Sequence, residues 1–153
     1  MDCVSLGVLV AKLIKIFLLF LLLLNTAYAE TWISLGGVTQ HFCTTCGYNG
    51  FNPGLGVQQD FYSDDLRLIG GVYYNSYYKA SFYGGATYQP LQYGPVRIGF
   101  VSGLVSNYPN LKVPAMALPV VSVESNNVGV DILGGPSLGN RTGLVTVNFK
   151  FKI

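Results

Sequence analysis

Charge is scarce in this chain of 153 residues: charged side chains make up 10% of the total, whereas a soluble domain carries about a quarter. Disorder is excluded as well, because half of the residues are apolar and disordered chains are poor in apolar residues. The formal net charge is only +2 and no basic patch is present, so nothing indicates binding to nucleic acid. The sequence contains no cofactor motif, and we predict no cofactor.

The chain also lacks an apolar run long enough for a transmembrane helix. The run at 16–24 falls well short of the roughly 20 residues that such a helix needs. Two lysines precede it and a small-x-small tripeptide follows it at 27–29, which is the arrangement of a secretory signal peptide. We therefore predict a cleaved signal peptide at 1–29 and one mature domain at 30–153.

No segment after residue 29 keeps a helical period. Short β-branched and aromatic runs alternate instead with clusters of Gly, Pro, Asn and Asp, which is typical of many short strands. The clearest strand is C-terminal, where apolar residues from Val145 to Ile153 alternate strictly with polar ones. The predicted strands are 31–40, 54–62, 67–76, 79–88, 94–104, 115–124, 127–134 and 143–152.

These strands predict a membrane barrel. Their lengths are close to the roughly 9–11 residues that a tilted strand needs to cross a bilayer. The short connections are 63–65, 89–90 and 125–127, and the longer ones are 41–53, 105–114 and 135–142. Such asymmetry and an even strand number predict an all-β fold, an eight-stranded antiparallel barrel that is integral to a Gram-negative outer membrane as a monomer. The tyrosines between 73 and 83 predict an aromatic girdle at the membrane interface.

Strand parity brings two distant segments together. If both termini lie on the same side of the membrane, the first and third strands end at the opposite rim, where His41 and the pair Asn75-Ser76 would meet. His41 is the only histidine, and imidazole is a natural general base for a serine nucleophile. Ser76 would be that nucleophile, with Asn75 orienting the ring or the substrate, in an acyl transfer. The alternative is that these are ordinary surface residues.

Cys43 and Cys46 form a C-x-x-C pair next to His41. A closed zinc site needs four ligands, and no second cluster is present. A redox motif would need a thioredoxin-like setting, which is absent. We predict a disulfide that closes a short segment of the first long loop in an oxidising compartment.

From Tyr48 to its end the chain resembles the lipid A palmitoyltransferases, eight-stranded outer-membrane barrels that move an acyl chain from phospholipid to lipid A. The resemblance is carried by 73–79 (YYNSYYK), by 118–123 (LPVVSV) and by the Gly-rich stretch 97–105. It implies that His41, Asn75 and Ser76 are the catalytic residues. The family carries Asp where this chain has Asn75.

The resemblance also implies sideways entry of lipid where Pro53, Pro119 and Pro136 interrupt the wall, since proline cannot donate to the strand ladder. A small residue that sets acyl-chain length would lie near Gly85 or Thr87. The expected function is therefore an acyltransferase whose partners are phospholipid and lipid A. Two alternatives stay open: a non-catalytic barrel with a structural or surface-binding role, and a lipid A esterase or acyloxyacyl hydrolase.

Overall fold

A computed structural model describes residues 29–43, 46–109, 114–135 and 143–153. The signal peptide predicted at 1–29 lies, apart from Ala29, outside the described residues. No helix among the described residues is long and apolar enough to span a membrane. The strands are β1 (Thr31–His41), β2 (Gly54–Phe61), β3 (Ser63–Tyr74), β4 (Ala80–Tyr93), β5 (Val96–Val105), β6 (Ala115–Glu124), β7 (Val128–Gly135) and β8 (Leu144–Lys152).

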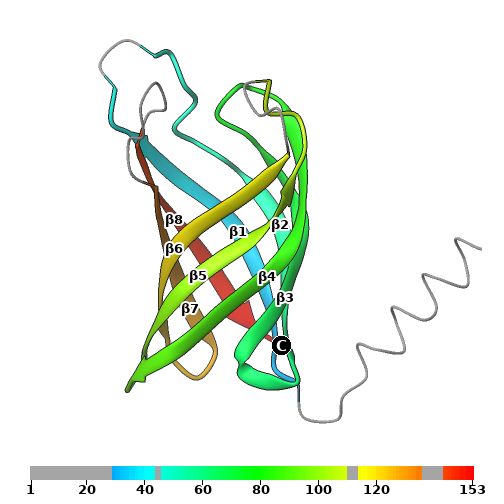
Figure 1. Ribbon diagram of the computed structural model, residues 1–153, viewed down its shortest axis with the longest axis vertical. Coiled ribbons are helices and arrows are strands. Elements are labelled where there is room, and N and C mark those ends of the chain that lie inside the picture. The colour runs from blue at the N-terminus through cyan, green and yellow to red at the C-terminus, as the bar shows by residue number, and fades with distance from the viewer. Residues whose placement is uncertain (1–28, 44–45, 110–113, 136–142) are drawn as a thin grey trace, which may run out of the picture.

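The strands form a closed antiparallel barrel in which each strand pairs with the next and β8 pairs with β1. This confirms the predicted all-β, eight-stranded antiparallel fold. Tyr62, 94–95 and 125–127 join strands at one end, the short-turn end, where the C-terminus also lies (Figure 1). The ends of β1, β3, β5 and β7, which the other connections follow, lie at the opposite end, the long-loop end.

Two predicted turns are wrong. The turn predicted at 89–90 does not exist, because β4 continues through Pro90 to Tyr93. The β4–β5 ladder shifts its register around Pro90, and this irregularity accommodates a residue that has no N–H to donate. The reversal follows at Gly94, whose φ of 59° favours glycine.

The turn predicted at 63–65 is also wrong, because β3 already begins at Ser63, directly after Tyr62. At its other end β3 stops at Tyr74 rather than at residue 76. The Asn75-Ser76 pair therefore belongs to the turn between β3 and β4, where its side chains are not tied to the alternation of a strand.

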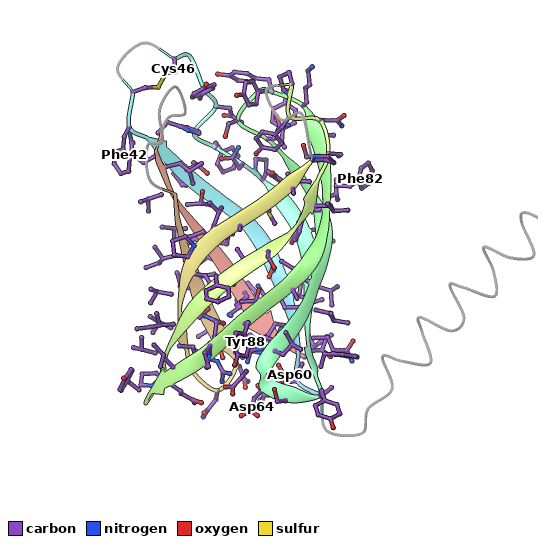
Figure 2. All side chains as sticks on the ribbon, in the orientation of Figure 1. Phe42, Cys46, Asp60, Asp64, Phe82 and Tyr88 are labelled. Atoms are coloured by element: carbon purple, nitrogen blue, oxygen red, sulfur yellow. A yellow bond between two sulfur atoms is a disulfide. The ribbon has the colours of Figure 1, made fainter. Side chains whose placement is uncertain are left out.

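The two faces of the wall differ in chemistry. In β5, buried Val101 and Val105 alternate with exposed Phe100 and Leu104, as the period of two in a strand requires. Phe82 of β4 points away from the barrel (Figure 2). Other exposed apolar side chains are Leu55, Val57, Val72, Ile132, Phe149 and Phe151. The outer surface of the barrel is thus largely apolar.

A bulge in β1 sets which residues face inward at the long-loop end. Trp32 is buried, and strict alternation from it would turn every odd-numbered residue of β1 outward. The ladder with β8 shifts its register between Leu35 and Val38, and beyond this point Val38 is exposed while Thr39 is buried. His41 therefore faces inward with Thr39.

Buried charges fill the lumen in the short-turn half. Arg67 is 2% exposed, with its Nε atom 2.6 Å from Asp60 and its other two nitrogens bonded to Glu124. Lys150 is 1% exposed, with its Nζ atom 2.6 Å from both Glu124 and Asp131. Because each of these cations has carboxylate partners, the network carries its charges without an unpaired cation.

Trp32 completes this network. The Arg67 guanidinium lies 5.7 Å and the Lys150 ammonium 5.2 Å from its ring centroid, within the range of cation–π attraction. Beneath the network a polar cavity of about 750 Å³ opens at the short-turn end. The interior of an eight-stranded barrel is barely wide enough for its own side chains, so this half does not form an open channel.

We expect Glu124→Gln to lower the free energy of unfolding by about 3–5 kcal/mol, because it removes the carboxylate shared by two buried cations. Urea unfolding of the refolded barrel in detergent micelles measures this loss. The matched control is Lys152→Gln, which breaks the partly exposed Lys152–Glu30 pair and should cost at most about 1 kcal/mol. Equal losses in the two variants would contradict the structural role of the network.

Candidate active site at the long-loop end

His41 and Ser76 meet at the long-loop end of the barrel. His41 is the last residue of β1, and Ser76 lies in the turn after β3. The Nε2 atom of His41 is 2.9 Å from the Oγ atom of Ser76, which is hydrogen-bonding distance. Residues 35 apart in the sequence thus form an imidazole–hydroxyl pair, and Ser76 is buried.

Asn75 shapes the turn that carries this serine. Its side-chain oxygen accepts hydrogen bonds from the backbone N–H groups of Tyr77, at 2.8 Å, and Lys79, at 3.0 Å. Its amide nitrogen donates to Ser81 Oγ at 2.7 Å and to the Asn107 carbonyl at 3.0 Å. The fully buried amide therefore uses both lone pairs and both hydrogens.

These bonds leave no part of the Asn75 amide to orient the ring of His41, which is the role that the sequence suggests for Asn75. Asn75 acts instead as a positioning residue of the turn.

His41 lies at the rim, among loop residues, and is partly buried. A neutral imidazole is the form that can act as a general base.

The segment 46–53 holds the ring in place. The Tyr48 ring packs against the His41 ring, with centroids 4.8 Å apart. The N–H of Asn49 donates to the Ser76 carbonyl at 2.9 Å. One segment thus contacts both members of the pair and fixes their separation.

Nε2 is the ring nitrogen that faces Ser76. In the neutral tautomer that carries its proton on Nδ1, Nε2 accepts the hydroxyl proton of Ser76. This is the direction in which a histidine activates a serine nucleophile.

Three tyrosines from three loops pack in a row that begins at the pair. Tyr77 lies between Tyr48 and Tyr108, with ring centroids 5.2 Å and 5.5 Å away. The Tyr108 hydroxyl is 2.8 Å from the Tyr73 hydroxyl. Of the three rings, Tyr48 is the one that packs on the imidazole.

Tyr73 and Tyr83 lie on the inner face of the wall, so the prediction that the tyrosines between 73 and 83 form an outer girdle is wrong for these two. Their rings meet edge to face at 5.8 Å, and a Cβ atom on Gly56 would lie 2.0 Å from the Tyr83 hydroxyl. Tyr74 and Tyr78 are exposed. Tyr73 lies an even number of residues after inward-facing Arg67 on the same strand. The alternation of side chains along a strand therefore predicts that Tyr73 also faces inward.

Cys43 and Cys46 are joined by a disulfide, with Cα atoms 5.9 Å apart. The bridge lies in the first long loop (Figure 2), between His41 and the segment that carries Tyr48 and Asn49. Both cysteines are therefore close in sequence to the residues that hold the ring.

The three prolines differ in what they do to the wall. Beyond Pro53 the β1–β2 seam resumes through a bridge between Val38 and Phe51. Pro119 lies at the point where the β6–β7 ladder stops, since pairing begins only at Val120 with Leu133. Among the described residues, Leu118 and Pro119 of β6 have no partner on β7, although β7 continues to Gly135. Pro136 lies outside the described residues.

Sequence reasoning missed Tyr48, Asn49 and Tyr108 as parts of the site. Each lies in a loop, where no strand period predicts direction. Of these residues, only the tyrosines could have been proposed as site residues from the sequence, because aromatic residues flank the candidate histidine and serine there.

Within the described ranges, no group of three or more His, Cys, Asp and Glu side chains is arranged to hold a metal ion. No family model matches the sequence, and no curated protein matches it significantly. The function therefore has to be argued from the geometry and from the sequence resemblance.

We expect Asn75→Asp to destabilise the barrel by about 1–3 kcal/mol, because a carboxylate cannot donate to the Asn107 carbonyl. We also expect no gain in Ser76 reactivity. The urea unfolding midpoint and the rate of serine labelling check both statements. Asn126→Asp, the same change in an exposed turn, is the control and should be neutral. A more reactive Asn75→Asp barrel would instead mean that this position serves as the acid of a triad.

Proposed function

We propose that this chain is an outer-membrane acyltransferase that moves an acyl chain from a phospholipid to lipid A through Ser76 and His41. The observation that carries the proposal is the 2.9 Å contact between His41 Nε2 and Ser76 Oγ. The resemblance of 73–79 to the lipid A palmitoyltransferases supplies the substrate class.

The chemistry needs no cofactor. Ser76 Oγ attacks the ester carbonyl of the phospholipid while its proton passes to His41 Nε2, and the departing alcohol takes that proton. A lipid A hydroxyl then gives its proton to Nε2 and attacks the acyl-serine, and the departing Ser76 oxygen takes that proton back. Each half-reaction returns the imidazole to the neutral form.

The outer surface supports a membrane location. Phe42 and Phe82, near the long-loop end, are 64% and 67% exposed and point away from the barrel (Figure 2). Similar apolar side chains cover the wall of β2, β5, β7 and β8. Soluble monomers rarely expose a continuous apolar surface of this extent, whereas the lipid-facing side of a membrane barrel requires one.

The inner face beneath the site suits an acyl chain. In the long-loop half, Gly85 pairs with Gly103 across β4 and β5, and buried Val105 lies on the same face as Gly103. These positions carry no charge. The charged side chains lie in the short-turn half, so an acyl chain that enters from the site would meet apolar wall first.

The register of the β3–β4 ladder also distinguishes the two predicted positions of the residue that would limit acyl-chain length. Thr87 pairs with Arg67 and lies level with the charged network, whereas Gly85 pairs with Ile69, nearer the site. Of the two predicted positions, Gly85 fits better, because it lies on the apolar side of that boundary.

The end of the described β6–β7 ladder at Pro119 supports sideways entry of lipid. A strand that lacks a ladder partner leaves an opening through which a lipid tail can pass without crossing hydrogen-bonded wall. Pro119 ends that ladder and the β1–β2 seam resumes beyond Pro53, so we assign entry to the β6–β7 seam.

We expect Ser76→Ala and His41→Ala each to lower lipid A acylation by on the order of 10⁴-fold, since each removes one member of the reacting pair. Mass spectrometry of lipid A from Gram-negative cells that express each variant measures the added acyl chain. Ser102→Ala, at an exposed position of β5, is the control. Heat-dependent electrophoretic mobility checks that each barrel is folded.

Other outcomes of that experiment identify the alternatives. Lipid A that loses an acyl chain only with the parent sequence would indicate an esterase. Unchanged lipid A with a folded barrel would reject both enzymes and leave a structural or binding role.

We expect Pro119→Val to slow lipid A acylation severalfold without destabilising the barrel. Valine supplies an N–H and a β-branched side chain, both of which favour extension of the β6–β7 ladder. Acylation rate and urea unfolding are the measurements, and Pro90→Val in β4 is the control. Acylation by Pro119→Val at the parental rate would reject entry at this seam.

A further inference from the structure

The strand that carries His41 and the strand that leads to Ser76 are not neighbours. The order of the barrel places β2 between β1 and β3, and β2 begins only after 49–53. This segment continues the line of β2 towards the rim, since Gly50 is bonded to β1 and Asn49 is bonded to the Ser76 carbonyl. The contact between imidazole and hydroxyl therefore depends on how 49–53 joins its two neighbours.

Pro53 interrupts the ladder on the β3 side of this segment. Gly54 pairs with Tyr73, so Pro53 lies opposite Tyr74, whose N–H donates to the Pro53 carbonyl at 2.8 Å. In an antiparallel ladder the two residues of such a pair exchange both hydrogen bonds, but proline has no N–H to give in return. The ladder by itself thus leaves the Tyr74 carbonyl without a donor.

The Asn52 side chain supplies the missing donor. Its Nδ2 atom donates to the Tyr74 carbonyl oxygen at 2.8 Å, and Asn52 is only 5% exposed. Asn75 and Ser76 follow Tyr74 directly in the chain. The bond therefore fixes the point at which the turn with the nucleophile begins.

The main chain of Asn52 holds the strand on the other side. Its N–H donates to the Gly37 carbonyl at 2.9 Å, within the bulge that turns His41 inward. A Cβ atom on Gly36 would lie 2.2 Å from the Asn52 carbonyl oxygen, so the bulge and Asn52 are in direct contact. One residue thus bonds to the bulge that orients the base and to the strand end that carries the nucleophile.

We infer that Asn52 is a positioning residue that sets the separation of His41 and Ser76, because it joins the bulge of β1 to the end of β3 where Pro53 interrupts the ladder. Asn52 acts through these two residues and has no contact with the reacting atoms. The inference rests on the proposed function in one respect only, namely that Ser76 reacts as a nucleophile with His41 as its base.

The test is the rate at which a long-chain alkyl fluorophosphonate labels Ser76 in the folded full-length barrel in detergent. In this reaction Oγ bonds to phosphorus, fluoride leaves, and the hydroxyl proton passes through His41 to solvent. We expect the parent to be labelled at Ser76 and Ser76→Ala to stay unlabelled. Asn52→Leu, which is similar in size, should be labelled about 10²-fold more slowly, since a displacement of about 1 Å between reacting groups has an effect of this size.

A double-mutant cycle with His41→Ala separates positioning from a general weakening of the barrel. In the His41→Ala background the base is absent, so Asn52→Leu should slow the residual labelling no further. A purely structural role would instead slow labelling by the same factor in both backgrounds.

Pro53→Val provides a rescue, because valine restores the N–H that the ladder lacks opposite Tyr74. Asn52→Leu combined with Pro53→Val should regain most of the lost rate. Asn126→Leu, the same change in an exposed turn at the short-turn end, is the matched control and should be labelled at the parental rate. Heat-dependent electrophoretic mobility checks folding, and Asn52→Ala is the second variant if the leucine barrel folds poorly.

Labelling of Asn52→Leu at the parental rate would overturn the inference, as would equal losses with and without His41 or a rescue variant as slow as Asn52→Leu. The failure of the proposed function is seen separately. A parent that is not labelled at Ser76 would reject the serine nucleophile and the role of Asn52 with it. A parent that is labelled as expected but leaves lipid A unchanged would reject lipid A acylation and leave the role of Asn52 standing.

Discussion

The position of His41 depends on one irregularity in the seam that closes the barrel. β1 must pair with β8 for the sheet to have no edge, and its ladder contains a single shift of register, at Gly36 and Gly37. A Cβ atom on Gly37 would lie 1.6 Å from the Val147 carbonyl oxygen, so only glycine allows the strands to approach this closely. Without the shift, His41 would face outward and Ser76 would lack a base. The register shift in the seam that closes the barrel therefore also determines where the imidazole lies.

The two halves of the barrel interior differ in their electrostatics. In the short-turn half Arg67 and Lys150 are paired with carboxylates, and these bonds cross between strands that are distant in sequence. In the long-loop half glycine, valine and tyrosine replace them. The network of Arg67 and Lys150 is therefore separate from the imidazole–hydroxyl pair. Stability and the proposed base catalysis would draw on different halves of one barrel.

Periodicity predicted the eight strands, because apolar and polar residue types alternate along them in the sequence. Because the first and third strands run in the same direction, the order of the strands alone predicted that His41 and Ser76 lie at the same rim of the barrel. The β4 boundary was missed because Pro90 signals a turn locally, whereas the register shift beside it satisfies the ladder. Nothing in the sequence showed that every donor and acceptor of the Asn75 amide is bonded. Two of its partners, Ser81 and Asn107, lie outside its turn. Contacts between loops have no period, and these contacts define most of the site.

Asn75, at the position where the resembling family carries Asp, changes how the proposed reaction would be driven. A neutral amide stabilises an imidazolium less than a carboxylate does, and the Asn75 amide is bonded within its own turn. The proposed reaction would then depend more strongly on how His41 and Ser76 are held together. The Asn49 N–H is bonded to the Ser76 carbonyl, and the Tyr48 ring packs on the imidazole. If Ser76 is acylated, transfer rather than hydrolysis requires that a lipid hydroxyl reach the acyl-serine faster than water does.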